Sequence, residues 1–135
     1  MQSRDLSKAG HTILIVDDEP AVITILEKIL SADGHTVHSA TSGQEGIKKA
    51  KAVIPDLILM DVLMPDMDGY EATARIKALP DMYDIPIIFL TGKAASDDGG
   101  RSFAVGGAAY LPKPFKEQQI RDVVNLAMKR AIKIY

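Results

Sequence analysis

The 135-residue sequence contains no cysteine at all. Without cysteine the chain can form no disulfide bond, no thiolate metal site and no nucleophilic thiol. A metal site in this protein must therefore be built without thiolate ligands, although the absence of cysteine says little about the compartment in which the protein works.

A large net charge and long apolar segments are missing as well. The formal net charge is -2, so the chain as a whole has no attraction to nucleic acid or to an anionic membrane. No apolar stretch approaches the roughly 20 residues of a membrane-spanning helix. Residues 1–10 lack the apolar region of a signal peptide, which predicts a cytoplasmic location. We expect no direct nucleic-acid partner and no membrane partner.

The composition is otherwise that of an ordinary globular protein, with 47% hydrophobic and 25% charged residues. A chain of 135 residues is long enough for one domain with one core. We expect a flexible leader over residues 1–11 and a single domain over residues 12–133.

Inside this domain, expected strands alternate with expected helices. The strands occupy residues 12–16, 35–40, 57–61, 85–90 and about 110–111, and the helices occupy residues 20–33, 42–53, 70–79, from about 96, and 116–132. Short loops and right-handed crossovers then predict an α/β fold with a doubly wound, five-stranded parallel sheet.

The stretch Leu57 to Gly69, LILMDVLMPDMDG, organises the rest of the chain. Four apolar residues run without alternation into Asp61, and turn-forming residues follow at once. An unbroken apolar run of this length fits a strand that is buried on both faces. Asp61 then lies at the carboxyl end of a strand, where open α/β sheets bind ligands. Taken alone, Asp61 has a simpler explanation, which is that it caps the following segment.

The first strand, Thr12 to Val16, ends in the same way, in Asp17 and Asp18. Two parallel strands thus bring three carboxylates to one edge of the sheet. Like charges about 4 Å apart repel by roughly 4 kcal/mol at an effective dielectric constant of about 20, so such a cluster needs a cation or raised pKa values. Because the ligands are all oxygens, the expected cation is Mg²⁺.

Two more strands end in Thr91 and near Lys113. Three acids, a hydroxyl and an amine are the groups that a phosphorylated carboxylate needs. The acids hold Mg²⁺, one carboxylate attacks phosphorus, the hydroxyl donates to a phosphoryl oxygen, and the ammonium offsets an added charge of about -1.5 to -2. Helix capping cannot explain all of these residue types at four separate strand ends.

Four motifs give the chain a resemblance to the receiver domains of two-component response regulators. They are VDDE at 16–19, MDVLMPDMDG at 60–69, LTG at 90–92 and YLPKPF at 110–115. The motifs are specific together, and they cover nearly the whole chain. The resemblance implies a flavodoxin-like three-layer sandwich with strand order 2-1-3-4-5.

The resemblance also implies which residues handle the phosphoryl group. Asp61 would be the phosphoacceptor, and Thr91 and Lys113 would bind the phosphoryl oxygens. Tyr110 would be an aromatic switch whose ring turns inward when Thr91 moves. The bond between Lys113 and Pro114 is expected to be cis, which would aim the lysine at the site.

For the metal, the resemblance implies a Mg²⁺ site shared by side chains and backbone. Asp18 would be a direct ligand, and Asp17 would support the ion through a water molecule. Asp61 and the backbone carbonyl of Leu63 would complete the protein's share of the ligands.

The sequence departs from similar domains in two places. Ala108 and Ala109 precede Tyr110 where similar domains often carry acids, so the exposed surface near Tyr110 is less charged than usual, and the sequence leaves the partner surface open. Gly99 and Gly100 lie in the fourth expected helix, and glycine costs about 1 kcal/mol relative to alanine inside a helix. We expect a helix that is short, frayed or shifted, or one that begins after Gly100.

Other polar and sulfur-containing residues have structural explanations. His35 and His38 are three residues apart in a strand and point to opposite faces, so they cannot chelate a metal together. We assign no function to them or to His11. Turn chemistry explains two acids, Asp66 and Asp68. Packing explains three methionines, Met60, Met64 and Met67.

The acids, the threonine and the lysine at the strand ends predict a phosphorylation-activated signalling switch. Its only catalysis would be its own phosphoryl transfer and autodephosphorylation, so we do not expect an enzyme that turns over a metabolite. Leu63 and Lys93, which flank the expected phosphoryl position, would tune hydrolysis by controlling the access of water. The phosphodonor would be the phosphohistidine of a sensor histidine kinase or of a histidine phosphotransfer protein, and the modification would change the binding of an unidentified downstream protein.

Two other functions share parts of this pattern. A receiver-like binding module that is not regulated by phosphorylation would be expected to lack an acid, the hydroxyl or the lysine. A phosphohydrolase with an aspartyl nucleophile typically carries a second aspartate two positions later, where this chain has Leu63. The sequence leaves open the cognate kinase, a phosphorylation-dependent homodimer, and whether the chain is a stand-alone protein or part of a longer one.

Overall fold

The computed structural model describes residues 10–92 and 109–133. In chain order its elements are β1 (Thr12–Val16), α1 (Pro20–Ala32), β2 (Thr36–Ala40), α2 (Gly43–Val53), β3 (Leu57–Asp61), α3 (Gly69–Lys77), β4 (Ile87–Thr91), β5 (Ala109–Pro112) and α5 (Glu117–Lys133). In the described part of the chain, no helix has the length and apolar character needed to cross a membrane.

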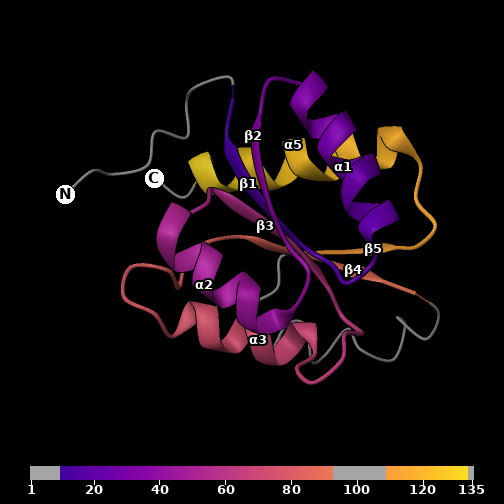
Figure 1. The fold of residues 1–135 in the computed structure, drawn as a ribbon. Helices are drawn as coiled ribbons and strands as arrows, with labels where there is room; N and C mark the ends of the chain where they lie inside the picture. The colour runs from indigo at the N-terminus through magenta and orange to yellow at the C-terminus, as the bar shows by residue number, and fades with distance from the viewer. Residues whose placement is uncertain (1–9, 93–108, 134–135) are drawn as a thin grey trace.

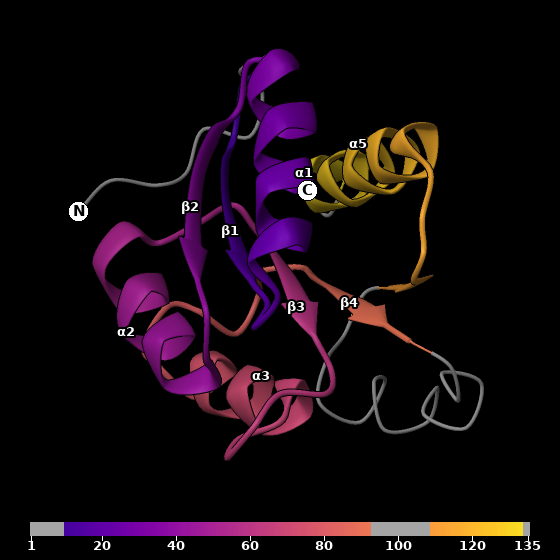
Figure 2. The same cartoon turned by 45° about the vertical axis from the view of Figure 1, so that its right-hand side comes forward.

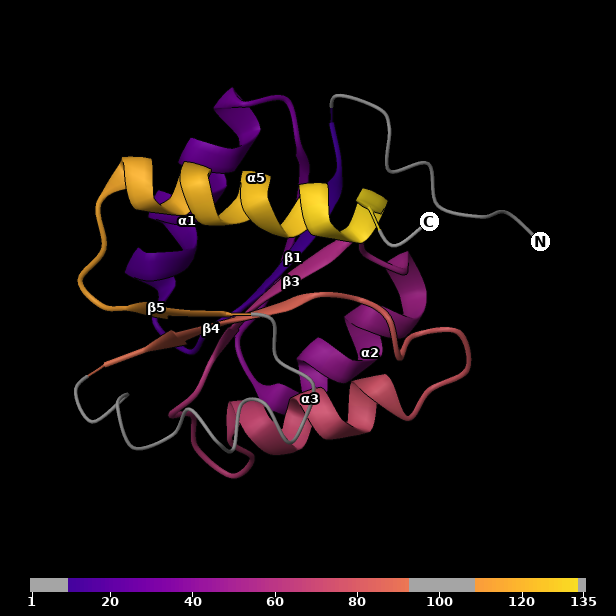
Figure 3. The same cartoon turned by 180° about the vertical axis from the view of Figure 1, so that it is seen from behind.

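The five strands form one parallel sheet in the order β2-β1-β3-β4-β5. Helices α1 and α5 cover one face of the sheet, and α2 and α3 cover the other (Figure 1, and from behind in Figure 3). This arrangement confirms the predicted α/β fold, the strand order and the three layers. Because the strands are parallel, their carboxyl ends all reach one edge of the sheet.

Two apolar clusters, one on each face of the sheet, form the core. Alternate residues of β1 and β3 separate between them: Leu14 and Ile58 pack on the side of α2 and α3, and Ile13 and Leu57 on the side of α1 and α5. All five residues of β3 are buried. Burial on both faces is why the sequence of this strand shows no alternation between apolar and polar residues.

Several element boundaries differ from the sequence prediction by one or two residues. β4 begins at Ile87 rather than 85, because the backbone of Ile85 still closes a turn with Met82 (N to O 3.4 Å). α3 ends at Lys77 rather than 79, because Leu79 N bonds to Ile76 O at 3.0 Å in a tightened last turn. The leader over residues 1–9 and the helix expected from about 96, including Gly99 and Gly100, lie outside the described residues.

The start of α2 is capped by a serine side chain, in a variant of the capping box. Ser42 Oγ accepts a hydrogen bond from Glu45 N at 3.1 Å, as a capping box requires. The Glu45 carboxylate instead reaches back to Thr41 N at 2.7 Å, one residue before the cap. Helix α3 is capped in a similar way by Asp68, whose Oδ1 accepts from Glu71 N at 2.8 Å.

Asp66 and the three methionines have the structural roles that the sequence predicts. Asp66 adopts a left-handed turn conformation with φ 71°, which aspartate tolerates better than most residues. The three methionines assigned to packing are all buried in the cluster between the sheet and helices α2 and α3: Met60, Met64 and Met67.

The opposite, amino-terminal edge of the sheet holds a group of polar contacts that explains two of the histidines. His11 N donates to His35 Nδ1 at 3.1 Å, and the two rings stack with centroids 5.7 Å apart. The buried Asp56 carboxylate accepts from Thr12 N at 2.8 Å and lies 3.9 Å from His11 Nδ1. Figure 2 shows how these segments, at the starts of β1, β2 and β3, lie far from the strand tips.

Candidate functional site

Three carboxylates gather where β1 and β3 end. Asp61 is the last residue of β3, and Asp17 follows β1 directly, held by a hydrogen bond from its backbone N to Ala40 O at 3.1 Å. One carboxylate oxygen each from Asp17, Asp18 and Asp61 lies within 4.8 Å of the others. Asp17 is 0% exposed and Asp61 is 3% exposed, so these charges are largely removed from water.

Lys113 joins this cluster from the end of β5. Its Nζ lies 2.9 Å from Asp17 Oδ2, 3.3 Å from Asp61 Oδ1 and 3.0 Å from Glu19 Oε1. Its backbone N donates to Thr91 O at 2.7 Å, which fixes the chain at this point. The bond from Lys113 to Pro114 is cis, as predicted.

Thr91 ends β4 at the same edge of the sheet. It is 2% exposed, and β4 is paired with β3 so that Leu90 lies opposite Asp61. Among the described residues, its Oγ1 makes a single, long hydrogen bond of 3.4 Å to Gly92 O, which is weak at this distance. The structure therefore brings together the strand ends that carry all five residues singled out in the sequence.

The close carboxylates shift the proton affinities of the site. Burial raises the pKa of Asp61 to about 7, and the negative charge of Asp17 adds to this, while Lys113 opposes it. For Lys113, burial by itself would lower the pKa, but the contacts of its ammonium with the carboxylates of Asp17 and Glu19 outweigh it and hold the pKa above its usual value. Burial is thus the main cause of the shift at Asp61, whereas at Lys113 the neighbouring acids overcome the effect of burial.

The donor set fits a hard divalent cation. Asp17 Oδ2 is buried and has no well-aligned hydrogen-bond donor among the described residues, so its 2.9 Å contact with Lys113 is ionic in character. The three neighbouring groups offer oxygen atoms alone. Carboxylate oxygens that share one position at this edge suit Mg²⁺, which takes one or two carboxylates and keeps several waters.

Glu19 is a member of this cluster that the sequence analysis did not single out. Its side chain is 61% exposed, yet it shares Lys113 with the two buried aspartates. Its backbone N donates to Asp17 Oδ1 at 2.9 Å, which also holds that carboxylate in place. The only signal in the sequence was its place directly after Asp17 and Asp18 in the VDDE motif.

A close approach between the start of α3 and the end of β3 shapes the site. Gly69 N donates to Val62 O at 2.8 Å. A Cβ at Gly69 would lie 2.1 Å from the carbonyl oxygen of Asp61, so no larger residue fits without moving the backbone. This glycine fixes the path of the chain after Asp61.

The remaining predicted site residues have less direct support. Leu63 is 70% exposed beside the site, and the metal-binding role of its carbonyl stays a prediction. Tyr110 is half-buried on β5 and packs against the core. Lys93 and Ala108 lie outside the described residues.

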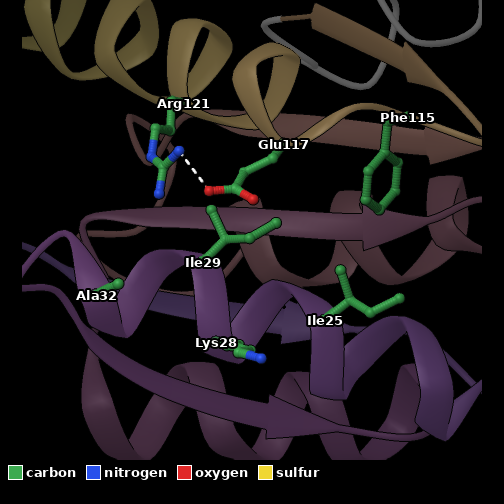
Figure 4. A pocket seen from close by; sticks show the side chains of 7 residues that line it. All are labelled: Ile25, Lys28, Ile29, Ala32, Phe115, Glu117 and Arg121. Atoms are coloured by element: carbon green, nitrogen blue, oxygen red, sulfur yellow. Dashed lines mark ion pairs between the residues drawn. The ribbon is translucent and has the colours of Figure 1, made fainter.

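A pocket of about 310 Å³ lies between α1 and α5 (Figure 4). Ile25 and Ile29 of α1 and Phe115 form its apolar lining, and an ion pair between Arg121 and Glu117 borders it. None of the lining residues belongs to the acidic cluster, so this pocket is separate from the candidate site.

Comparison with known proteins defines the class of this domain. Residues 13–125 match the family model of the response regulator receiver domain. The chain therefore belongs to this family, as the motifs predicted.

Individual relatives agree with this assignment. The chain is 34% identical over 116 residues to Protein PilH of Pseudomonas aeruginosa, covering 86% of this chain and 96% of PilH. The crystal structure of the Vibrio cholerae chemotaxis protein CheY4 superposes with a TM-score of 0.84 at 28% identity, covering 88% of this chain and 99% of that one.

Longer proteins match over part of their length. The chain is 34% identical over 119 residues to the alkaline phosphatase synthesis transcriptional regulatory protein PhoP of Bacillus subtilis, covering 88% of this chain and 49% of PhoP. It spans 13% of the signal transduction histidine-protein kinase BarA of Escherichia coli. The chain thus corresponds to about half or less of the length of these relatives.

Proposed function

We propose that this domain is a phosphorylation switch in which Asp61 accepts a phosphoryl group from a phosphohistidine. The observation that carries the proposal is the Lys113 ammonium, 3.3 Å from Asp61 and 2.9 Å from Asp17, beside three carboxylates at one edge of the sheet. Such a site combines a nucleophile with positive charge for the transferred group.

In the proposed reaction an oxygen of the Asp61 carboxylate forms a bond to phosphorus. The phosphorus–nitrogen bond of the donor breaks, and its electron pair stays on the imidazole nitrogen. The Lys113 ammonium then stabilises the added negative charge, and the Thr91 hydroxyl donates to a phosphoryl oxygen. These roles need positioning and electrostatic stabilisation rather than further covalent chemistry.

Asp17, Asp18 and Asp61, with the carbonyl of Leu63, are the groups we propose to hold Mg²⁺. When bound, this ion would supply positive charge that offsets the charge developing on the transferred phosphoryl group. The buried Asp17 oxygen that lacks an aligned donor supports this assignment.

The consequence of phosphorylation would be a change of conformation that alters the binding of a downstream protein. We propose Thr91 and Tyr110 as the residues that carry this change, and a sensor histidine kinase or a histidine phosphotransfer protein as the donor. A modified carboxylate can shift the equilibrium between two conformations only by as much as it stabilises one of them over the other. The domain would catalyse its own modification and its reversal, in the cytoplasm, and no other reaction.

The test is labelling with a small-molecule phosphodonor. Incubation with acetyl phosphate and Mg²⁺ should add the mass of one phosphoryl group to the intact protein, and chelation of the ion should prevent this. Asp61→Asn should abolish the label. Asp66→Asn, which changes an exposed carboxylate in the neighbouring loop, is the matched control and should be labelled normally.

Full labelling of Asp61→Asn would refute the assignment of the acceptor. Failure of the unmodified protein to accept label, from both acetyl phosphate and a phosphohistidine donor, would favour a binding module that is not regulated by phosphorylation.

A further inference from the structure

Three aromatic rings from three different elements pack in a row beneath α3. Tyr70 of α3 lies against Phe89 of β4 with ring centroids 4.8 Å apart, and Phe89 lies against Tyr110 of β5 with centroids 5.9 Å apart. Tyr70 and Phe89 are almost fully buried, at 1% and 0% exposure. Tyr110 is the half-buried outer member of the row.

The two ends of this row are joined by a hydrogen bond between their hydroxyl groups. Tyr70 Oη and Tyr110 Oη are 2.5 Å apart, and either can be the donor. The bond can form only when the Tyr110 ring lies inward, over the core cluster that contains Phe89 and Tyr70. An outward rotation of Tyr110 would break it.

Tyr70 is also tied to the acidic site through the backbone. It follows Gly69, whose N donates to Val62 O at 2.8 Å and where an added Cβ would collide with the Asp61 carbonyl oxygen. The segment between Asp61 and Tyr70 is therefore a closed turn, capped at the start of α3 by Asp68. The position of Tyr70 relative to Asp61 is fixed by this turn.

We propose that Tyr70 is a positioning residue that holds Tyr110 inward before Asp61 is phosphorylated. Helix α3 would thereby set the position of the Tyr110 ring in the unphosphorylated domain. The effect of this on signalling rests on the proposed function. Because the Tyr110 ring would already be mostly inward, phosphorylation would change the ratio of inward to outward positions by a smaller amount.

The test is the variant Tyr70→Phe, which keeps the buried ring and removes only the hydroxyl. Loss of one neutral hydrogen bond should change the ratio of inward to outward Tyr110 by about two- to tenfold. Hydroxyl-radical footprinting read by mass spectrometry should show a corresponding rise in the oxidation of Tyr110. Tyr83→Phe, which removes a hydroxyl from a residue that is 75% exposed, is the matched control and should leave Tyr110 unchanged.

A second measurement separates positioning from general loosening of the core. Oxidation of Phe89 should stay low in Tyr70→Phe, and acetyl phosphate with Mg²⁺ should restore the protection of Tyr110 in that variant. Equal oxidation of Tyr110 in the variant and the unmodified protein would overturn the proposal. So would a parallel rise at Phe89. Labelled variant protein in which Tyr110 stays exposed would instead contradict the role of Tyr110 in the proposed phosphorylation switch.

The same samples show which inference fails. The comparison made before the phosphodonor is added tests the hold of Tyr70 on Tyr110. The intact mass after its addition tests the phosphorylation of Asp61 independently.

Discussion

Replacing Asp61 by asparagine should make the metal-free protein more stable while it destroys the proposed acceptor. The Asp61 side chain is almost completely buried, beside the carboxylates of Asp17 and Asp18. Asparagine has nearly the same shape and carries no charge. The substitution therefore removes the cost of burying a charged group, to which repulsion from Asp17 adds.

The size of this effect follows from the raised pKa of Asp61, from 3.8 to about 7. A shift of about three units corresponds to an upper limit of about 4 kcal/mol, since each unit is worth about 1.4 kcal/mol. The site opens to water at the edge of the sheet and the titrations of neighbouring acids are linked, so we expect about 1 to 2 kcal/mol. For a domain of this size that gain raises the Tm by about 3 to 8 °C.

The pH dependence gives the prediction its sign. Because the folded-state pKa of Asp61 lies above the unfolded value, the folded protein binds more protons between pH 3.8 and about 7. The stability of the unmodified protein therefore falls as pH rises through this window. The advantage of Asp61→Asn should be small near pH 4 and complete above about pH 7.

Urea unfolding of both proteins at a series of pH values, in EDTA, measures this difference. Added Mg²⁺ at high pH should stabilise the unmodified protein more than the variant, because the variant lacks one carboxylate ligand. Asp66→Asn keeps Asp61, so it serves again as the control and should show the same fall in stability between pH 3.8 and about 7 as the unmodified protein. An Asp61→Asn variant that is less stable than the parent above pH 7, or whose advantage is the same at pH 4, would refute the electrostatic reasoning.

Three further substitutions test packing and hydrogen bonding. Gly69→Ala should destabilise the domain by about 1 to 3 kcal/mol in urea unfolding, because its Cβ would lie 2.1 Å from the Asp61 carbonyl oxygen; unchanged stability would mean that the turn relaxes freely. Thr73→Val should raise stability by about 1 kcal/mol, because Thr73 Oγ1 is buried with no hydrogen-bond partner among the described residues; a loss would point to a partner for the hydroxyl. Burial, together with the charge of His11, lowers the pKa of His35 below 6.5, so the unfolded chain binds more protons than the folded protein below about pH 6.5 and stability falls there. His35→Gln should make this fall in stability smaller. Identical pH profiles of the variant and the unmodified protein would exclude this contribution.

The features that could be predicted from the sequence are those that depend on short-range patterns. The unbroken apolar run that ends in Asp61 is enough by itself to predict a strand that is buried on both faces in a parallel sheet. The position of Asp17 and Asp18 followed from the rule that parallel strands end at one edge. The capping serine at 42 was visible in its spacing to Glu45.

The features that could not be predicted depend on which side chains meet after folding. Glu19 reaches Lys113 across 94 residues of chain, and nothing in the VDDE motif says which of its acids points there. The pairing of Tyr70 with Tyr110 joins residues 40 positions apart on different elements. The hydrogen bond between His35 and His11 depends on the register in which β1 and β2 pair, which the sequence does not show.

The position of Lys113 links the electrostatics of the site to its proposed chemistry. One ammonium group is shared by Asp17, Asp61 and Glu19, and a single positive charge cannot balance these acids together with Asp18. This shortfall adds to the effect of burial, which is the main cause of the raised pKa of Asp61. A cation with two positive charges would correct it and reduce the hold of the aspartates on Lys113. Because the ammonium lies on a flexible four-carbon stem, it could then turn toward a phosphoryl group on Asp61 without movement of the backbone. Because of this charge imbalance, we expect Asp61 to accept a phosphoryl group only when a divalent ion is present.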